Sequence, residues 1–403
     1  MGFLTKILAL LASLFVAGSV TTKETFTNTE LPTDWEHVAS DVETVALPED
    51  LLKDLQKGDV LLEAKNAIMT YFYKEVEEDT LISGANAGVV SMTNDIANVY
   101  YMSDAAEQLR NWPEDTAFTG AWLGRSRDSN WCIVTRVEAG SSAEKAGIQV
   151  GDIIYSVDDQ VVSASTLGLA QLFMNGKTGS TIKVTLYRDY EEMEAELTCD
   201  TTATVCSAAM LSEKIAYLEI ISLDESEAIE KAVAFLAESN PEVMIVDLRG
   251  AIGNDMDVTA KVAGALLGNV EIAKCQGKQG EPEVVKAEGS GLDIGYVVLV
   301  DQYTSDGAEI LAQALREAKK APLVGETTFG NTPKLTWYDL NDDLMCLATA
   351  RYLSAEGVEI HMNGLEVDTE VERSADDDAA DEDSQLNAAL ELAEKMTGEE
   401  EDS

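Results

Sequence analysis

The turn Thr304–Glu309 carries side chains that could do chemistry, because a hydroxyl at Ser305 stands beside a carboxylate at Asp306. A valine-rich apolar run, Tyr296–Val300, precedes the turn and predicts a strand buried on both faces. Apolar residues recur at helical spacing from Ile310 onward and predict a helix after the turn. A turn between the carboxyl end of a strand and the positive end of a helix can hold reactive side chains. The sequence therefore predicts a candidate site here.

Asp306 supports two interpretations. Its spacing to Glu309 matches a capping box, in which the first and fourth residues satisfy free N–H groups at the start of a helix. Alternatively, Asp306 could share acid–base chemistry with Asp255 or Asp257. A Ser–His–Asp triad is not favoured, because His361 is the only histidine in this half of the chain and nothing ties it to a serine.

The elements around this turn predict a multidomain protein of the α+β and α/β classes. From Lys214 onward, apolar strand patterns alternate with amphipathic helix patterns, which is typical of a layered α/β core. Strands are expected at 215–220, 243–248, 296–300, 322–325 and 345–352, and helices at 225–238, at 258–267 and after the turn. Residues 51–115 have helical character, whereas residues 116–190 contain short strands interrupted by glycines.

The run SSAEKAGIQVGDIIYSVDDQVV, at Ser141–Val162, closely resembles the core of a PDZ domain. Within this run Ala143–Ala146 predicts a short helical turn, and Thr166–Met174 then predicts the helix that flanks the ligand groove of such a domain. The resemblance implies a small β-barrel-like domain that adds a peptide as a strand and holds its terminal carboxylate with backbone N–H groups. The residues Trp122, Leu123 and Gly124 match the carboxylate-binding loop, and the bulky Trp122 is expected to narrow or cap the groove.

The strand segments IAYLEI, VMIVDLRG and LVGETTFG follow, in the same order, the core of the C-terminal processing (tail-specific) peptidases. The turn segment YVVLVDQYTSDGAEI also resembles this Ser–Lys peptidase family, whose members carry a PDZ domain. The resemblance extends roughly from Tyr100 to Met396 and implies a layered, ClpP/crotonase-like core. It also implies a serine-type peptidase that acts on protein C-termini and uses no cofactor.

The resemblance implies that three catalytic positions of the family are replaced in this chain. Asp306 stands where the family has its serine nucleophile, Asn331 where it has its lysine base, and Leu335 where it has the orienting glutamine. In the oxyanion segment, Gly253 and Asn254 are the residues that can still turn the chain. We therefore expect a pseudopeptidase that binds peptides or protein C-termini as a scaffold or regulator, with an active homologue as a further candidate partner.

A shifted pair, Ser305 and Lys334, is the alternative active site. It would make the chain an active serine endopeptidase, because a desolvated lysine can take the proton of a serine hydroxyl. An extended backbone from Asn331 to Leu335 would turn Lys334 away from Asn331, and Pro333 would disturb a strand there. The structural interpretation is a turn hydroxyl at Ser305 and a solvated charge at Lys334.

The composition excludes several classes of partner. The chain has 403 residues and a net charge of -46, with 74 acidic against 28 basic residues. This charge would repel nucleic acid and anionic membrane surfaces. The sequence has two histidines and contains no phosphate loop, dinucleotide fingerprint or CxxC motif, so no cofactor and no Cys/His zinc site are expected. A cation-dependent adhesion or stalk protein is a further, weaker alternative.

The amino terminus predicts an extracytoplasmic protein. Residues 1–20 have the layout of a signal peptide, with a lysine and then an apolar run, and an uncleaved anchor is the alternative to cleavage. The predicted units are a linker at 24–50, a helical region at 51–115, a PDZ domain at 116–190, a peptidase-like core at 191–373 that begins with a polar connector at 191–209, and an acidic segment with a terminal helix at 374–403. Cys199 and Cys206 could pair in an oxidising compartment.

Overall fold

The computed structural model describes residues 49–95, 97–113, 115–126, 129, 131–164, 167–253, 255–373 and 383–398. The predicted signal peptide at 1–20, the predicted linker except for its last two residues, and the acidic run at 374–382 lie outside these ranges. Across the described residues, no helix is both long and apolar enough to cross a membrane. The chain divides into two compact units, Met1–Ile82 and Ser83–Ser403.

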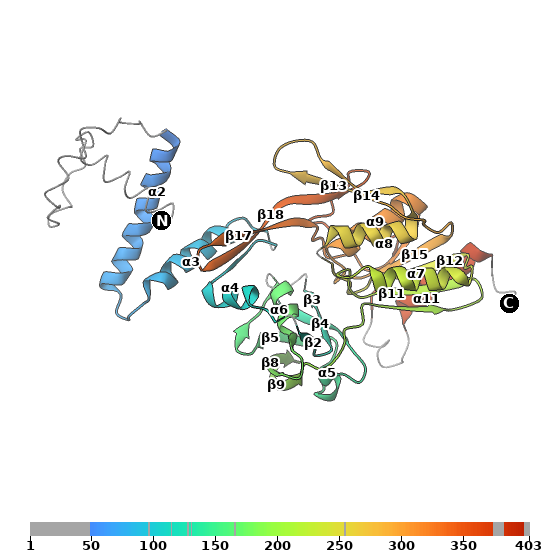
Figure 1. Cartoon of the computed structure of the whole chain (residues 1–403), viewed down its shortest axis with the longest axis horizontal. Helices are drawn as coiled ribbons and strands as arrows, with labels where there is room; N and C mark the ends of the chain where they lie inside the picture. The colour runs from blue at the N-terminus through green and yellow to red at the C-terminus, as the bar shows by residue number, and fades with distance from the viewer. Residues whose placement is uncertain are drawn as a thin grey trace. The chain divides into compact units, whose positions relative to one another are not determined.

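The region predicted as helical contains helices and one strand that the sequence did not reveal. Helix α2 (Glu49–Tyr71) lies in the first unit, and α3 (Glu78–Ser91) begins there and ends in the second (Figure 1). Strand β1 (Val99–Tyr101) then precedes α4 (Ser103–Arg110) and pairs with β18 (Asp343–Ser354). Three residues are too few for a periodic pattern, and the partner strand is distant in the sequence, so β1 was not predictable.

The PDZ domain is built on a six-stranded antiparallel sheet with the order β3-β4-β5-β8-β9 and with β6 on β5. Its strands are β3 (Ala121–Arg125), β4 (Cys132–Val137), β5 (Ile153–Val157), β6 (Gln160–Val161), β8 (Thr181–Arg188) and β9 (Glu191–Thr198), and a separate pair joins β2 (Thr116–Phe118) to β7 (Asn175–Lys177). Helices α5 (Ser142–Lys145) and α6 (Leu167–Phe173) lie where the sequence predicts them.

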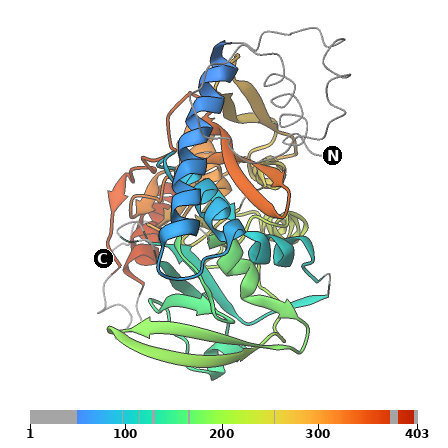
Figure 2. The same cartoon turned by 90° about the vertical axis from the view of Figure 1, so that its left-hand side faces the viewer.

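The polar connector predicted at 191–209 is wrong for most of its length. Strand β9 pairs with β8 over eight residues and closes one edge of the PDZ sheet as a long hairpin (Figure 2). Strand β10 (Cys206–Met210) already belongs to the next domain, where it pairs with β11 (Ile215–Ile220). Met193, Ala195 and Leu197 alternate with exposed glutamates along β9, a strand pattern that the prediction of a polar connector did not take into account.

The peptidase-like core is a three-layer α/β structure. Its sheet has the order β10-β11-β12-β15-β16-β19, and every pair from β11 to β19 is parallel. The other strands are β12 (Val243–Asp247), β15 (Gly295–Val300), β16 (Leu323–Gly325) and β19 (Thr369–Glu370). Alternate residues of these strands face opposite sides, and each side is buried under helices.

Helices cover both faces of this sheet. Helices α7 (Glu227–Glu238), α8 (Met256–Leu267) and α9 (Gly307–Lys319) share one apolar cluster with one face of the strands (Figure 1). Helix α11 (Ser384–Thr397) packs with Ala389 and Ala393 on the other face. The carboxyl ends of β11, β12 and β15 therefore meet at one edge of the sheet, and the turn from β15 to α9 lies at this edge.

A second sheet extends from the core. It has the order β1-β18-β13-β14, and β17 pairs with β18 as a hairpin. Strands β13 (Val270–Gly277), β14 (Glu283–Ala287) and β17 (Pro333–Leu340) were not predicted as strands. Strand β17 begins just after Asn331, so this sheet fixes the position of the loop that faces the turn before α9.

Candidate active site

The turn before α9 holds Asp306 in a strained backbone conformation. Its φ is 59° and its ψ is −128°, a region in which a residue with a side chain costs about 1–3 kcal/mol. The Asp306 N–H donates to the carbonyl of Asn331 at 2.9 Å, and the Gly307 N–H donates to the carbonyl of Gly253 at 2.8 Å. The two surrounding loops thus hold the turn, and strain of this kind is typical of functional sites.

The Asp306 carboxylate is buried and accepts three hydrogen bonds. Asn331 Nδ2 donates to Oδ1 at 2.6 Å, while Arg125 Nη1 and Ser305 Oγ donate to Oδ2 at 3.1 Å and 3.0 Å. Only 6% of Asp306 and 1% of Asn331 is exposed. The two positions that the sequence aligns with a nucleophile and its base therefore lie in direct contact, but as a carboxylate and an amide.

The predicted capping box is wrong. Asp306 is the N-cap residue of α9, yet its side chain makes no capping hydrogen bond, because Arg125 and Asn331 lie outside the helix and take both oxygens. The Glu309 carboxylate turns to the facing loop instead, where it accepts from Thr328 Oγ1 and from the Gly330 and Asn331 N–H groups. Complete burial raises the pKa of Glu309 to about 7, although these hydrogen bonds act to lower it.

Arg125 is the functional residue that the sequence analysis missed. It ends strand β3 of the PDZ domain and is 9% exposed. Its Nε donates to the carbonyl of Ala164 at 3.2 Å, and its guanidinium lies 5.8 Å from the ring centre of Phe329. A buried carboxylate at position 306 implies that a basic side chain lies nearby to neutralise it. The sequence alone does not identify which of the 28 basic residues is this partner.

The predicted oxyanion position presents an acceptor rather than a donor. An oxyanion is stabilised by N–H groups that point at the reacting atom. Here the Gly253 carbonyl faces the turn and accepts the Gly307 N–H, so that donor is already used. A side chain at Gly253 would collide with Leu223, which keeps the loop close to its neighbour. Asn254 lies outside the described residues.

The structure does not bring Ser305 and Lys334 together. Ser305 is 1% exposed, and its hydroxyl donates to Asp306. Lys334 lies on β17 with 47% of its side chain exposed, and its Nζ is 3.9 Å from a carboxylate oxygen of Glu283 on β14. Leu335 packs against an apolar cluster that joins the PDZ core to residues of β1 and β18. A solvated lysine that pairs with a surface glutamate is not a desolvated base for a buried serine.

Asp255 and His361, which the sequence offered for acid–base chemistry and for a Ser–His–Asp triad, have other partners in the structure. The Asp255 carboxylate caps α8 by accepting from the N–H groups of Asp257 and Val258. His361 accepts from the Thr332 N–H through Nδ1 at 3.1 Å, and its Nε2 lies 3.1 Å from Asp95 Oδ2. Both ring nitrogens therefore have partners, and neither partner is a serine.

The three residues predicted to bind a peptide carboxylate lie in strand β3, not in a loop. The Trp122 ring packs on Phe118, and its Nε1 donates to Glu138 at 2.9 Å; its narrowing of the groove stays a prediction. Gly124 lies between Thr135 of β4 and Tyr303 of the core, and a side chain there would collide with Thr135. The N–H of Leu123 donates to a side chain of α6, so this strand edge already has an internal partner.

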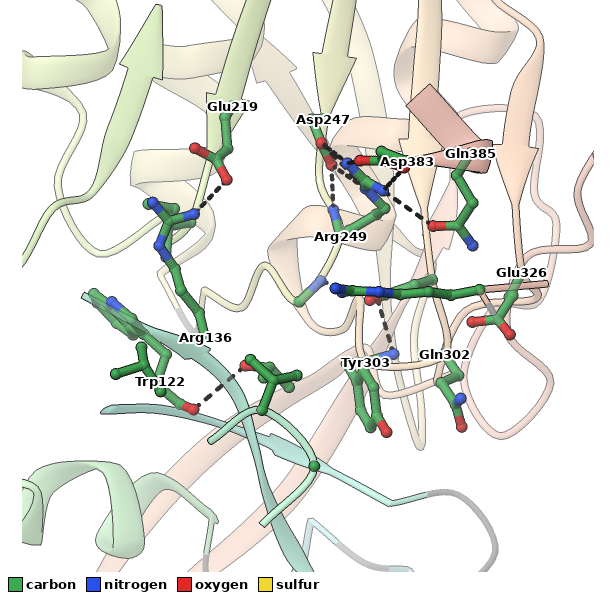
Figure 3. Close-up of a pocket in the computed structure, with 18 residues that line it drawn as sticks. Trp122, Arg136, Glu219, Asp247, Arg249, Gln302, Tyr303, Glu326, Asp383 and Gln385 are labelled. Atoms are coloured by element: carbon green, nitrogen blue, oxygen red, sulfur yellow. Dashed lines mark hydrogen bonds and ion pairs between the residues drawn. The ribbon is translucent and has the colours of Figure 1, made fainter. Parts of the chain in front are cut away.

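A cavity of about 620 Å³ lies where the PDZ domain meets the carboxyl ends of the core strands (Figure 3). Arg136 of β4 reaches across it to pair with Glu219 of β11. On the core side, Arg249 pairs with both Asp247 and Asp383. Together with the ion pair between Arg125 and Asp306, the contact between Arg136 and Glu219 ties the PDZ domain to the core at two points.

The described residues contain no group of three or more His, Cys, Asp or Glu side chains arranged to hold a metal ion. The alternative of a cation-dependent adhesion protein thus has no site in this part of the chain. The five cysteines are free thiols, so the suggested pairing of Cys199 with Cys206 is absent. Burial raises the pKa of both thiols.

The fold and the site define a class: a PDZ domain joined to a layered α/β core of the serine-peptidase type. A model of peptidase family S41 matches residues 214–371, and a PDZ-domain model matches residues 133–188. The chain is 30% identical over 327 residues to the carboxy-terminal processing protease CtpA of Bacillus subtilis (strain 168). This alignment covers 78% of this chain and 69% of CtpA. The chain therefore belongs to peptidase family S41, among the PDZ-containing carboxy-terminal processing proteases.

Two further comparisons agree with this assignment. The protease CtpB of the same organism is 25% identical over 348 residues, covering 80% of this chain and 70% of that protein. The solved structure of a photosystem II D1 C-terminal processing protease aligns with a TM-score of 0.60 at 21% identity, covering 78% of this chain and 92% of that one. This likeness confirms the predicted fold class.

Proposed function

We propose that this protein is a secreted, catalytically inactive member of its family that binds peptides or protein C-termini as a scaffold or regulator. The observation that supports the proposal best is the contact between Asp306 and Asn331, with Arg125 as the counter-ion. It occupies the place where the family resemblance requires a hydroxyl and an amine.

The chemistry of these groups opposes acyl transfer. The Asp306 carboxylate places a negative charge where an oxyanion would have to form, and its oxygens already accept three hydrogen bonds. The amide of Asn331 cannot accept a proton from a nucleophile. The Gly307 N–H is committed to Gly253. Each of these features alone would slow the reaction, and they act on different parts of it.

A binding role uses what the chain retains. PDZ domains take a peptide C-terminus as an added strand, and this chain keeps strand β3 and helix α6, which border the groove. An active homologue is a further candidate partner. This chain would regulate it by competing for the same substrate, since the two share a fold. The signal-peptide layout of residues 1–20 supports an extracytoplasmic location.

A fluorophosphonate probe tests the proposal directly. We expect the full chain to remain unlabelled and its peptidase rate to be lower than that of CtpA from Bacillus subtilis by a factor on the order of 10⁴ to 10⁶. CtpA serves as the positive control in both assays. Labelling at Ser305 that is abolished in Ser305→Ala and weakened in Lys334→Ala would instead establish the alternative, an active endopeptidase with a shifted dyad.

A further inference from the structure

The peptide groove of the PDZ domain is closed by a side chain of its own helix. Strand β3 is an edge strand of the sheet, and α6 packs along its free side. Gln171, on α6, reaches this edge, and its Oε1 accepts the N–H of Leu123 at 2.8 Å. A peptide added to β3 would need the same N–H for its own carbonyl or carboxylate oxygen.

The side chain of Gln171 makes the hydrogen bond to the Leu123 N–H that a bound peptide would make. Its Oε1 takes the position of a ligand oxygen, while its Nε2 is buried and has no hydrogen-bond partner in the described part of the chain. A buried donor without an acceptor is costly, so the closed arrangement gains one hydrogen bond and loses another. Leaving the strand therefore costs the side chain no more than the one hydrogen bond to Leu123.

A second contact draws the same helix region toward β3. Arg125 Nε donates to the carbonyl of Ala164, in the segment that leads into α6, at 3.2 Å. The guanidinium of Arg125 then continues to Asp306 in the core. Helix α6 is thus held to the edge of β3 at Gln171, and the segment before it is held by the side chain of Arg125.

We propose that Gln171 is an internal competitor that keeps the PDZ groove closed until a peptide with a free C-terminal carboxylate displaces it. This inference rests on the proposed peptide-binding function. A carboxylate oxygen accepts a stronger hydrogen bond than a neutral amide oxygen, so a free C-terminus can replace Gln171 at Leu123 with a net gain. An internal peptide carbonyl is equivalent to the amide it would displace and gains little.

The test compares Gln171→Ala with wild type in the full chain. The probe is a pool of short fluorescein-labelled peptides with randomised C-terminal residues and a free carboxylate, and the same pool amidated is the second ligand. We expect Gln171→Ala to tighten anisotropy-measured binding of the free-acid pool about two- to tenfold, the value of one neutral hydrogen bond. Gln160→Ala, an exposed glutamine on β6 of the same domain, is the matched control and should change nothing.

Residue-resolved hydrogen–deuterium exchange gives a second, ligand-free measurement. The Leu123 amide should exchange faster in Gln171→Ala than in wild type and should be protected again by the free-acid pool. Weaker or unchanged peptide binding in Gln171→Ala would overturn the inference, as would unchanged exchange at Leu123. If neither wild type nor Gln171→Ala binds any peptide, the proposed peptide-binding function is wrong as well. If both bind peptide equally, only the proposed role of Gln171 is wrong.

Discussion

Replacing Arg125 with alanine should destabilise the protein by about 3–5 kcal/mol, because it leaves the buried Asp306 carboxylate without its cation. The two side chains are only 10% and 6% exposed, so solvent cannot substitute for the lost charge. Urea unfolding at neutral pH measures this loss as a lower midpoint. The matched control is Arg351→Ala, which breaks a surface pair with Glu359 and should cost no more than about 1 kcal/mol.

A double-mutant cycle separates the ion pair from the other contacts of Arg125. In an Asp306→Ser background, Arg125→Ala no longer strands an anion, so it should cost less than in wild type by roughly 0.5–3 kcal/mol. Equal costs in the two backgrounds would mean that Arg125 acts only through Ala164 and Phe329. In that case the carboxylate at position 306 would not be what holds the PDZ arginine at this site.

Glu309→Ala should destabilise the protein by roughly 3–5 kcal/mol, since each of three buried donors left without an acceptor costs about 1–3 kcal/mol and the removed carboxylate was itself costly to bury. The donors are Thr328 Oγ1 and the N–H groups of Gly330 and Asn331. The loop that carries Asn331 would lose its anchor to α9. Urea unfolding measures the loss, and faster amide exchange confined to residues 328–332 would locate it.

The raised pKa of Glu309 gives this residue a defined pH signature. Burial lifts its pKa from 4.5 to about 7, so the folded protein holds the proton more tightly than the unfolded chain. Its contribution to stability is therefore greatest below pH 4.5, falls as the pH rises to about 7, and is then constant. The interval corresponds to roughly 3 kcal/mol of unfolding free energy.

Glu309→Gln isolates this contribution, because glutamine does not titrate. The unfolding free energy of wild type minus that of Glu309→Gln should fall by roughly 3 kcal/mol between pH 4.5 and pH 8. The exposed Glu281→Gln provides the control, for which the difference from wild type should stay level. A level difference for Glu309→Gln would show that the buried carboxylate titrates at an ordinary pH.

The sequence predicted the parts of this fold that repeat a local pattern. Strand 215–220, the helix after the turn and the short helix within the PDZ motif all appear as expected, because apolar spacing and glycine placement determine them locally. Strand β1 depends on a partner far away in the chain, and β13 pairs with the distant β18 as well as with the nearby β14. Strand β9 does show an alternation of Met193, Ala195 and Leu197 with glutamates, which the prediction of a connector there did not use.

Part of the site was also predictable from the sequence, and part was not. The motif matches aligned Asp306 and Asn331 with the nucleophile and base positions of the family, and the structure brings these two side chains together. The roles of Arg125, Glu309 and Gln171 depend on side-chain directions that a sequence does not specify. The capping box failed for this reason: the spacing was right, but stronger partners outside the helix took the carboxylate.

The carbonyl of Gly253 limits how an oxyanion-binding site could be built at this turn. It faces the turn and holds the Gly307 N–H, and this bond depends on the path of the main chain rather than on a replaceable side chain. Reinstating a serine and a lysine by substitution would leave that arrangement in place. Under the proposed function, a serine at position 306 and a lysine at position 331 would therefore not be enough for acyl transfer, since the peptide unit at Gly253 would also have to rotate.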